Sequence, residues 1–328
     1  MRAARLHAPG DLRLAEEPAP ESRPGWTRIA VGAVGLCGSD LHWYAEGGIG
    51  DARLDQPVVP GHEMGGVALD GPYAGQVVAI DPSIPCDRCE HCREGNPNLC
   101  EHQDFAGHGG FDGGLQEELR WPTDRLHPMP EGIDPVAASV LEPLGVAIHA
   151  WDLGHVRLAD RVAVVGCGPI GLLLVQLAVS LGAREVWAVE PLAHRRAAAE
   201  RYGADRVLTP DQAREQPPAS CEVVFEVHGG PDAVELSMQL ARGGGRVALV
   251  GIPDEDRTTF TASLARRKGL TLVCVRRMKE VYARAVTAVQ RGHVDLDSLV
   301  SDRFPLADAA AGFDFAARRA GLKTVIEI

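Results

Sequence analysis

The middle of the chain alternates between short apolar runs and longer stretches with helical character. Four of the short runs are rich in β-branched residues and have the length of buried strands: 162–165, 186–189, 223–227 and 247–250. Strands that alternate with helices are typical of a doubly wound parallel sheet. The pattern therefore predicts an α/β fold for this part of the chain.

The spacing of apolar residues predicts two helices and the faces that they bury. Residues 169–181, directly after the first run, are apolar almost all round, as in a helix that is buried against a sheet. A later helix is predicted over 279–291, with an apolar face formed by Val281, Ala285, Val286 and Val289.

A glycine-rich loop, GCGPIG at 166–171, joins the first predicted strand to the buried helix. Because the motif follows a strand, opens a helix and precedes an acidic residue at the end of the next strand, it predicts a dinucleotide site. Gly166 permits the tight turn, Gly168 lets a pyrophosphate approach, and Gly171 allows close packing of helix on strand. The helix N-terminus adds partial positive charge.

The acidic residue is Glu190, whose carboxylate can bind a ribose diol and would repel the 2′-phosphate of NADP, so NAD is preferred. Arg195 and Arg196 are placed to reach such a phosphate, with a solvated helix face as the alternative. Glycines also follow two later strands, where they either line the nicotinamide or only form turns. The residues predicted to bind the cofactor are Gly166, Gly168, Pro169, Ile170, Gly171, Glu190, Arg195, Val227, Val250 and Gly251.

Length and charge narrow the class of protein. The 328 residues, 45% of them hydrophobic, predict about two domains. The net charge of −12 and the lack of a basic stripe argue against nucleic acid or an anionic membrane as a partner. No apolar run approaches membrane-spanning length and no signal-peptide pattern opens the chain, so we expect a cytoplasmic protein with reduced thiols.

Four cysteines lie in the run CDRCEHCREGNPNLC with C-x2-C-x2-C-x7-C spacing, which is typical of a structural zinc site: Cys86, Cys89, Cys92 and Cys100. Two disulfides are the first alternative, but a reduced cytoplasmic chain argues against them. A zinc ribbon that binds nucleic acid is the second, and the acidic charge argues against it.

A second candidate metal site lies upstream, in GLCGSDLH at 35–42 and PGHE at 60–63. Cys37, His62 and a carboxylate would make a three-ligand site with room for water or substrate, as in catalytic zinc. A lone cysteine and a lone histidine are more often core residues, and only the neighbouring motifs favour the metal interpretation.

The chain resembles the medium-chain, zinc-dependent alcohol dehydrogenases over essentially its whole length. The matching segments are GLCGSDLH with Trp43 and Tyr44 after it, GHE at 61–63, the four-cysteine lobe after IDPS, DGG at 112–114 and EPLGVAIHA at 142–150. The resemblance is to the polyol branch, which includes sorbitol, xylitol and L-idonate 5-dehydrogenases. The EGGIG and IDPSIPC runs are most similar to L-idonate 5-dehydrogenase.

This resemblance implies two zinc ions in each chain. Cys37 and His62 match the ligands of the catalytic ion, while Glu63 and Glu142 match carboxylates that bind it directly or through a water. Which carboxylate binds directly stays open. The four cysteines match the ligands of the structural ion.

The resemblance also implies roles around the catalytic ion. Ser39 matches a hydroxyl beside the bound substrate, and His42 matches a histidine of the proton relay to solvent. Asp40 matches a position that orients a ligand, with a loop cap as the alternative. Tyr44 and Arg276 match positions near the substrate.

The implied architecture is a mostly β, GroES-like catalytic domain, 1–147 and 275–328, with a Rossmann domain, 148–274, that binds NAD. The implied reaction transfers hydride from a secondary alcohol of a small polyol or sugar acid to NAD and gives a ketone. A homotetramer or homodimer is expected.

Three alternatives stay open: a threonine-type amino-alcohol dehydrogenase, a zinc-free reductase of the quinone-reductase kind, and a noncatalytic protein. Cys167, Cys221 and Cys274 are predicted to be small core residues. The histidines His91, His102 and His108 show no ligand set of their own in the sequence.

Overall fold

The structure is a computed structural model that describes residues 1–108, 110–217 and 220–328. Its contacts divide the chain into two compact units. The first consists of residues 1–143, 282–286 and 296–328, and the second of 144–281 and 287–295. Compared with the boundaries predicted from the sequence, the contacts assign residues 144–147, 275–281 and 287–295 to the second unit.

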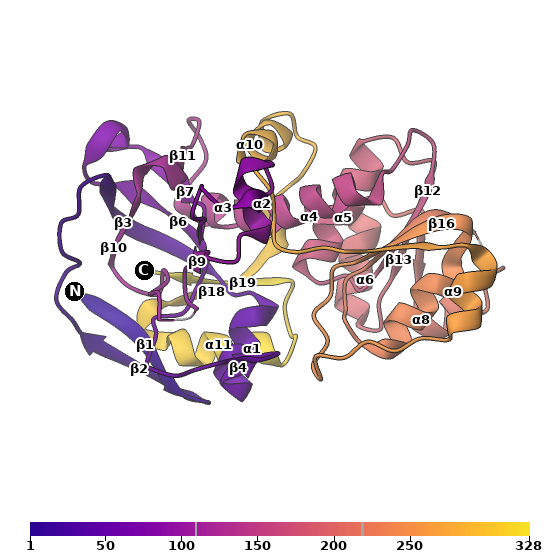
Figure 1. Cartoon of the computed structure of the whole chain (residues 1–328), viewed down its shortest axis with the longest axis horizontal. Helices are drawn as coiled ribbons and strands as arrows, with labels where there is room; N and C mark the ends of the chain where they lie inside the picture. Colours follow the sequence, from indigo (N-terminus) through magenta and orange to yellow (C-terminus); the bar gives the residue numbers. More distant parts are fainter. Residues whose placement is uncertain (109, 218–219) are drawn as a thin grey trace. The chain divides into compact units, whose positions relative to one another are not determined.

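The first unit is built on a seven-stranded sheet with the order β11-β7-β6-β3-β19-β18, in which β10 also pairs with β3 (Figure 1). Its strands are β3 (Trp26–Gly35), β6 (Glu63–Ala68), β7 (Val77–Ile80), β10 (Glu118–Pro122), β11 (Leu126–Pro128), β18 (Val300–Pro305) and β19 (Lys323–Glu327). Strand β3 buries Ile29, Val31 and Ala33 at every second position, as a sheet with one core face requires. This core fixes the ends of β3 and β6, from which the candidate metal ligands project.

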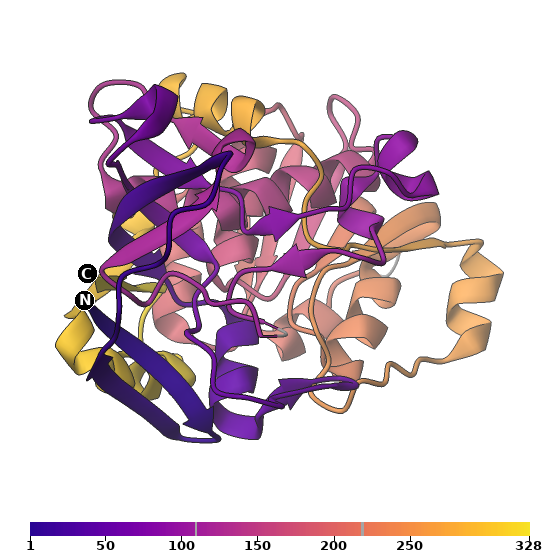
Figure 2. The same cartoon turned by 60° about the vertical axis from the view of Figure 1, so that its left-hand side comes forward.

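Short ribbons and helices surround this sheet. The ribbons pair β1 (Arg2–Ala8) with β2 (Asp11–Glu16), β4 (Gly48–Ile49) with β5 (Ala52–Arg53), and β8 (Ser83–Ile84) with β9 (Asp104–Phe105). The helices are α1 (Gly38–Glu46), α2 (Glu90–Arg93), α3 (Pro135–Ser139) and α11 (Ala309–Ala317). Figure 2 shows the indigo β1–β2 ribbon beside the yellow α11, in agreement with the contacts between β2 and that helix.

The second unit contains a six-stranded parallel sheet with the order β14-β13-β12-β15-β16-β17. Its strands are β12 (Arg161–Val165), β13 (Glu185–Val189), β14 (Arg206–Leu208), β15 (Cys221–Glu226), β16 (Ala241–Leu249) and β17 (Thr271–Cys274). The chain runs outward from β12 in one direction and then outward from β15 in the other. The carboxyl ends of β12 and β15 therefore form the switch point at which such sheets bind ligands.

The helices of the second unit are α5 (Pro169–Ser180), α6 (Ala193–Arg201), α7 (Pro210–Arg214), α8 (Pro231–Leu240) and α9 (Ala262–Lys268). Two further helices have residues in both units: α4 (Leu141–Gly154) and α10 (Tyr282–Gln290). Helix α5 contacts β12 and β13, whereas α8 contacts β12, β15 and β16. Because the crossovers after β12 and β15 run in opposite directions and such crossovers are right-handed, these two helices are expected on opposite faces of the sheet. Residues 171–178 of α5 are all buried, which confirms the prediction of a helix that is apolar all round.

All four predicted strands are present, and the predicted α/β class is confirmed. The sequence missed β14 and β17, which are short edge strands with half-exposed or exposed side chains. Cys167 and Cys221 are fully buried as predicted. The prediction for Cys274 was wrong, because this residue ends the edge strand β17 and is exposed.

One helical run, 135–154, is long and apolar enough to cross a membrane by composition, contrary to the prediction that no run approaches that length. Its mean hydropathy is 1.2, and 78% of it is buried within the protein. Burial of this kind is what a core helix needs, so its apolar character is explained by the fold.

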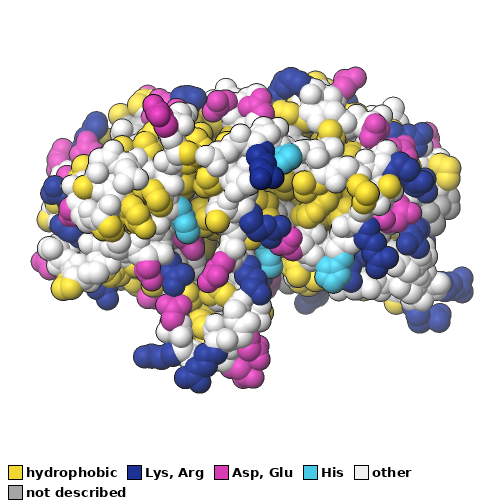
Figure 3. Space-filling model, turned by 90° about the horizontal axis from the view of Figure 1, so that it is seen from above, with side chains coloured by type: hydrophobic (Ala, Val, Ile, Leu, Met, Phe, Trp, Pro, Cys, Tyr) yellow, Lys and Arg dark blue, Asp and Glu magenta, His cyan; other side chains and the backbone are white. Residues whose placement is uncertain are grey.

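The surface carries both signs of charge. On the face shown in Figure 3, basic and acidic side chains are interspersed among apolar and uncharged groups. This agrees with a sequence that has a net charge of −12 and no basic stripe.

Candidate functional site

The first candidate ligand, Cys37, lies where β3 gives way to α1. It is the N-cap residue of α1, and its backbone N–H donates a hydrogen bond of 2.9 Å to Oδ2 of Asp40. The three-residue spacing from Cys37 to Asp40 is thus that of a helix cap, in which a side chain satisfies an otherwise unpaired N–H. The cap fixes the backbone that carries the Cys37 sulfur.

The same Asp40 also holds His62. Its Oδ1 lies 3.1 Å from Nδ1 of His62, and both side chains are buried, with 1% and 4% of Asp40 and His62 exposed. With Nδ1 bound to the carboxylate, Nε2 is the nitrogen left for a metal. Asp40 is therefore both a helix cap and the group that orients His62, so the two predicted roles coexist.

The charges of this pair support each other. Burial disfavours the charged imidazole, but the Asp40 carboxylate and the Cys37 sulfur outweigh it and raise the pKa of His62 well above its usual value. Burial would also raise the pKa of Asp40, yet His62 and the Cys37 N–H lower it below its usual value. Asp40 is consequently a carboxylate that can balance positive charge on the His62 ring.

Three donor atoms meet at the ends of β3 and β6. The ligand atoms of Cys37, His62 and Glu63 all lie within 4.8 Å of one another. A thiolate, an imidazole and a carboxylate form a donor set that zinc accepts. The structure therefore brings together Cys37, His62 and Glu63, which were all predicted as candidate ligands although Cys37 and His62 are 25 positions apart in the sequence.

Glu142 is buried beside this group, but in the described part of the chain it lies outside the three-residue set. Burial raises the pKa of Glu142 to about 7. Glu63 and Asp81 add to the rise, whereas His62 and Lys323 oppose it. A cation bound at the site would favour the ionised form of Glu142.

His108 was missed in the sequence as part of this site. Its ring lies 5.5 Å from that of His62, and ring nitrogens of both come within 4.8 Å of a carboxylate oxygen of Asp40. Trp43 and Phe105 flank His108 at 5.2 and 5.1 Å between ring centroids. The prediction that His108 belongs to no ligand set was thus wrong. The loop that carries His108 is far from His62 in the sequence but close to it in the fold.

The DGG motif positions the segment that leads into His62. Oδ1 of Asp112 accepts a hydrogen bond of 2.9 Å from the Val59 N–H, and Asp112 also binds Arg5. A side chain at Gly113 would overlap the carbonyl oxygen of Gly61. The motif therefore acts on the backbone beside the metal group.

The four predicted structural ligands also gather. The sulfur atoms of Cys86, Cys89, Cys92 and Cys100 all lie within 4.8 Å of one another, and none is in a disulfide. Hydrogen bonds from backbone N–H groups lower the pKa of Cys86 to about 6. Four converging sulfurs fit one tetrahedral zinc with no open position, as in a site that braces a loop.

The glycine-rich loop has the geometry of a dinucleotide turn. Gly166 has a φ of +100°, which favours glycine, and an added Cβ on Gly171 would overlap the carbonyl oxygen of Gly166. Gly168 is the N-cap of α5, and the nearest atom to an added Cβ there is Nη1 of Arg195, at 3.7 Å. Space thus remains above Gly168, where the motif needs a pyrophosphate to approach.

Glu190 is tied into the same loop. Its carboxylate is buried, and its two oxygens accept hydrogen bonds of 2.8 Å from the Cys167 N–H and 3.0 Å from the Leu192 N–H. Arg196 donates to the carbonyl oxygens of Glu190 and Pro191, so its guanidinium is held by the backbone.

A carboxylate that the sequence analysis missed supports the other predicted coenzyme residues. Glu226 ends β15 and accepts from the N–H groups of His228 and Gly229 at 2.8 and 2.7 Å. Its backbone oxygen accepts from Val250 and Gly251. Burial, which outweighs these hydrogen bonds, raises the pKa of Glu226. The sequence did contain a signal for this residue, because Glu226 is the one acidic residue in the otherwise apolar run 223–227.

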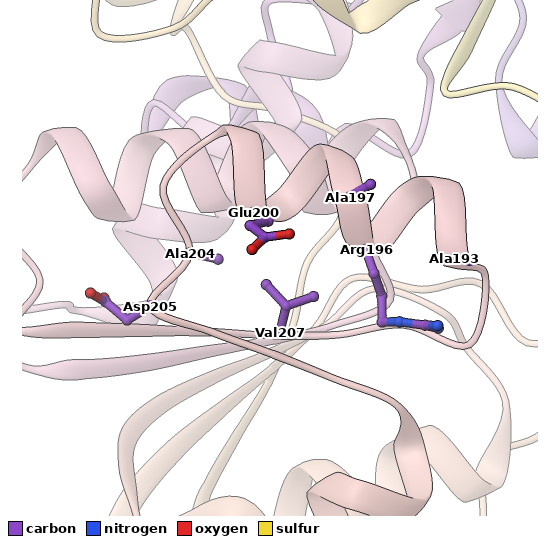
Figure 4. Close-up of a pocket in the computed structure, with 7 residues that line it drawn as sticks. All are labelled: Ala193, Arg196, Ala197, Glu200, Ala204, Asp205 and Val207. Carbon is purple, nitrogen blue, oxygen red and sulfur yellow. The ribbon is translucent and has the colours of Figure 1, made fainter.

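A surface pocket of about 400 Å³ lies along α6 and β14 (Figure 4). It is lined by Ala193, Arg196, Ala197, Glu200, Ala204, Asp205 and Val207. It contains neither Glu190 nor the glycine-rich loop, so it does not correspond to the predicted coenzyme site.

The remaining predicted site residues differ in how close they lie to the metal group and in how exposed they are. Ser39 lies next to the metal group, with Oγ 3.5 Å from Nε2 of His62. His42 pairs with Glu46, one turn later in α1, at 3.1 Å. Tyr44 packs 4.9 Å from Phe313 between ring centroids. The Tyr44 hydroxyl donates to Asp314, and Arg276 is exposed.

Comparison with known proteins agrees with this geometry. Residues 23–131 match the family described as the Alcohol dehydrogenase GroES-like domain, and residues 169–291 match the family described as Zinc-binding dehydrogenase. The chain is 31% identical to Sorbitol dehydrogenase 2 of Saccharomyces cerevisiae, over 98% of this chain and 96% of that protein.

Two solved structures are similar over the whole chain. L-Idonate 5-dehydrogenase of Escherichia coli has a TM-score of 0.93 at 28% identity, covering 100% of this chain and 98% of the other. A Sinorhizobium meliloti protein described as a zinc-binding dehydrogenase bound to NADP has a TM-score of 0.90 at 29% identity, covering 100% and 99%. The chain therefore belongs to the medium-chain, zinc-dependent alcohol dehydrogenase family, and it is an oxidoreductase that acts on CH–OH groups.

Proposed function

We propose that this protein uses zinc and NAD to oxidise a secondary alcohol of a polyol or sugar acid to a ketone. The observation that carries the proposal is the convergence of Cys37, His62 and Glu63 within 4.8 Å, with Asp40 fixing the His62 ring. The sorbitol dehydrogenase relatives and the L-idonate 5-dehydrogenase fold support the substrate class.

Cys37, His62 and either Glu63 or Glu142 would hold the catalytic ion. When bound there, zinc supplies Lewis acidity that lowers the pKa of an alcohol and so makes hydride departure possible. Asp40 supports this chemistry because its contact with Nδ1 of His62 leaves Nε2 as the nitrogen that can bind the metal.

Ser39 and His42 are proposed to pass the alcohol proton outward. The Ser39 hydroxyl is buried next to His62, whereas the His42 side chain is 19% exposed and its partner Glu46 is 54% exposed. The series runs from a buried hydroxyl to solvated groups on the same helix, which is the order a proton exit needs.

Glu190→Ala is expected to move cofactor preference from NAD toward NADP. A charge-assisted hydrogen bond to the ribose contributes about 1.5–3 kcal/mol to binding, so its loss should lower the affinity for NAD by about 10–150-fold. Because Glu190 also accepts two backbone hydrogen bonds, the variant should have a lower Tm as well. The ratio of kcat/KM with NADP to that with NAD measures the shift.

Glu200→Ala is the matched control, since it removes the same charge from α6 in the exposed pocket of Figure 4. It should leave the ratio unchanged. An unchanged ratio in Glu190→Ala would show that Glu190 serves only the loop.

The function itself is tested with a panel of polyols, aldonic acids and threonine, each supplied with NAD and with NADP, alongside metal analysis. Two zinc ions per chain and NADH formation from a polyol or aldonic acid are expected. One zinc ion and no alcohol oxidation would contradict the proposal and favour a reductase without catalytic zinc. Turnover of threonine alone would indicate an amino-alcohol dehydrogenase.

The same preparation tests the proposed assembly, a homotetramer or homodimer, by its native mass.

A further inference from the structure

Arg5, in strand β1, uses every donor of its guanidinium group. This group has five N–H donors in a planar fork. Nε and Nη2 donate to the two carboxylate oxygens of Glu17 at 2.9 and 2.7 Å. Nη1 and Nη2 donate to the two oxygens of Asp112 at 2.8 and 2.9 Å, and Nη1 also donates to the carbonyl oxygen of Pro57 at 3.3 Å. Each donor thus has an acceptor, and only 20% of the side chain is exposed.

The three acceptors of Arg5 come from segments that are far apart in the sequence. Glu17 directly follows β2, whereas Pro57 and Asp112 lie 52 and 107 positions after Arg5. Paired hydrogen bonds from a guanidinium to a carboxylate fix both distance and orientation, which a lysine does not do. Arg5 therefore joins the β1–β2 ribbon to the two segments that lead to and lie beside His62.

Asp112 extends this network to the residues that precede His62. Its Oδ1 also accepts a hydrogen bond of 2.9 Å from the Val59 N–H. In the other direction, the Gly113 N–H donates to the carbonyl oxygen of Val59 at 2.6 Å, and the Gly114 N–H donates to that of Gly61 at 2.8 Å. The segment 59–61 is thus held at both ends by the residues 112–114.

This segment has little room to move on its own. Gly61 has a φ of +97°, and a Cβ on Gly113 would overlap the carbonyl oxygen of Gly61. A shift of Asp112 would consequently be transmitted to His62, whose Nδ1 lies 3.1 Å from Oδ1 of Asp40. Metal ligands tolerate displacements of only about 0.2 Å from their ideal distances, so a small shift of the ring should weaken metal binding.

Arg13 is an arginine of the same ribbon without such contacts. It lies directly opposite Arg5 in the pairing of β1 with β2, and it forms an ion pair with Asp11. Its side chain is 62% exposed, and surface pairs of this kind contribute little to stability. Burial and the contacts with distant segments therefore distinguish Arg5 from its neighbour.

We propose that Arg5 is a positioning residue for His62, which acts through Asp112 and the segment 59–61 to keep the imidazole in place for the catalytic metal. The inference rests on the metal site of the proposed function. It gives the N-terminal ribbon a part in that site, although the ribbon supplies none of the candidate ligands.

The affinity of the catalytic site for Zn²⁺, measured by competition with a chromogenic chelator, tests this inference without turnover. Arg5→Met should weaken binding of the catalytic ion by about 10-fold, the lower end of what loss of a partner around metal ligands commonly causes. The structural ion should bind as in wild type. Cys37→Ser, which is expected to lack the catalytic ion, identifies the signal that belongs to it.

Three further variants separate positioning from stability. Asp112→Asn, an isosteric change, should give a similar loss of affinity and serves where Arg5→Met does not fold. The double variant should bind zinc no more weakly than the weaker-binding single variant, because both changes act on the same segment. Glu17→Gln weakens the hold on the end of β2 but leaves Arg5 bound to Asp112, so it should lower the Tm and keep the wild-type affinity.

Arg13→Met is the matched control, and it should leave both affinities and the Tm unchanged. Additive losses in the double variant would overturn the inference, as would a loss in Glu17→Gln as large as that in Arg5→Met. Two bound ions with affinities that Arg5→Met leaves unchanged would overturn the inference alone. Wild-type protein that binds only one Zn²⁺ per chain would overturn the proposed function together with it.

Discussion

Cys37→Ser should remove the catalytic metal and lower kcat/KM by more than about 100-fold. Substitution of residues that only support a metal ligand commonly costs up to about 100-fold, and loss of a ligand itself should cost more. Cys37 supplies the thiolate among three converging donors, and serine does not replace a thiolate as a zinc ligand. The fold should survive, because serine is a preferred N-cap residue and Asp40 can still accept the backbone N–H of residue 37.

Metal analysis and circular dichroism separate these effects. Cys37→Ser should retain one zinc ion per chain and a Tm close to that of wild type. His62→Ala would not separate loss of the metal from loss of stability, since it would leave the buried Asp40 carboxylate without its imidazole partner.

Cys274→Ser is the control, because Cys274 is exposed at the edge of the second sheet. It should keep both metals and full activity. Two zinc ions and normal turnover in Cys37→Ser would contradict the assignment of the site.

The sequence was sufficient where the signal is local. The apolar runs gave the strands β12, β13, β15 and β16, because strands buried on both faces are continuously hydrophobic. The spacing of the four cysteines predicted the four-sulfur cluster, since all four residues lie within 15 consecutive positions. Edge strands such as β17 have weaker patterns because solvent reaches one side.

The sequence was insufficient where distant segments meet. Lys323 looks like any lysine near the start of a strand, and only the pairing of β19 with β3 brings it to Glu63. His108 likewise joins His62 through the path of a loop. For Asp40, by contrast, the resemblance implied a residue that orients a metal ligand, with a loop cap as the alternative, and the structure shows the contacts of both roles.

Gly171→Ala should destabilise the protein and abolish NAD binding together. An added Cβ would overlap the carbonyl oxygen of Gly166, and this atom belongs to the backbone and cannot rotate away. Overpacking of this kind costs about 1–3 kcal/mol and sometimes more. Because Gly166 is at a φ of +100° in the loop itself, relief of the overlap must distort the coenzyme site.

Gly168→Ala should separate the two effects, since the nearest atom to its Cβ is 3.7 Å away. This variant should keep the wild-type Tm yet lose affinity for NAD, because the methyl group occupies the space that a pyrophosphate needs. Gly243→Ala, with the nearest atom at 3.9 Å and outside the loop, should change neither quantity. Thermal unfolding and NADH fluorescence titration measure them. If Gly168→Ala bound NADH as wild type does, the loop would not be the pyrophosphate site, whereas a wild-type Tm in Gly171→Ala would mean that helix α5 can move away from β12 without cost.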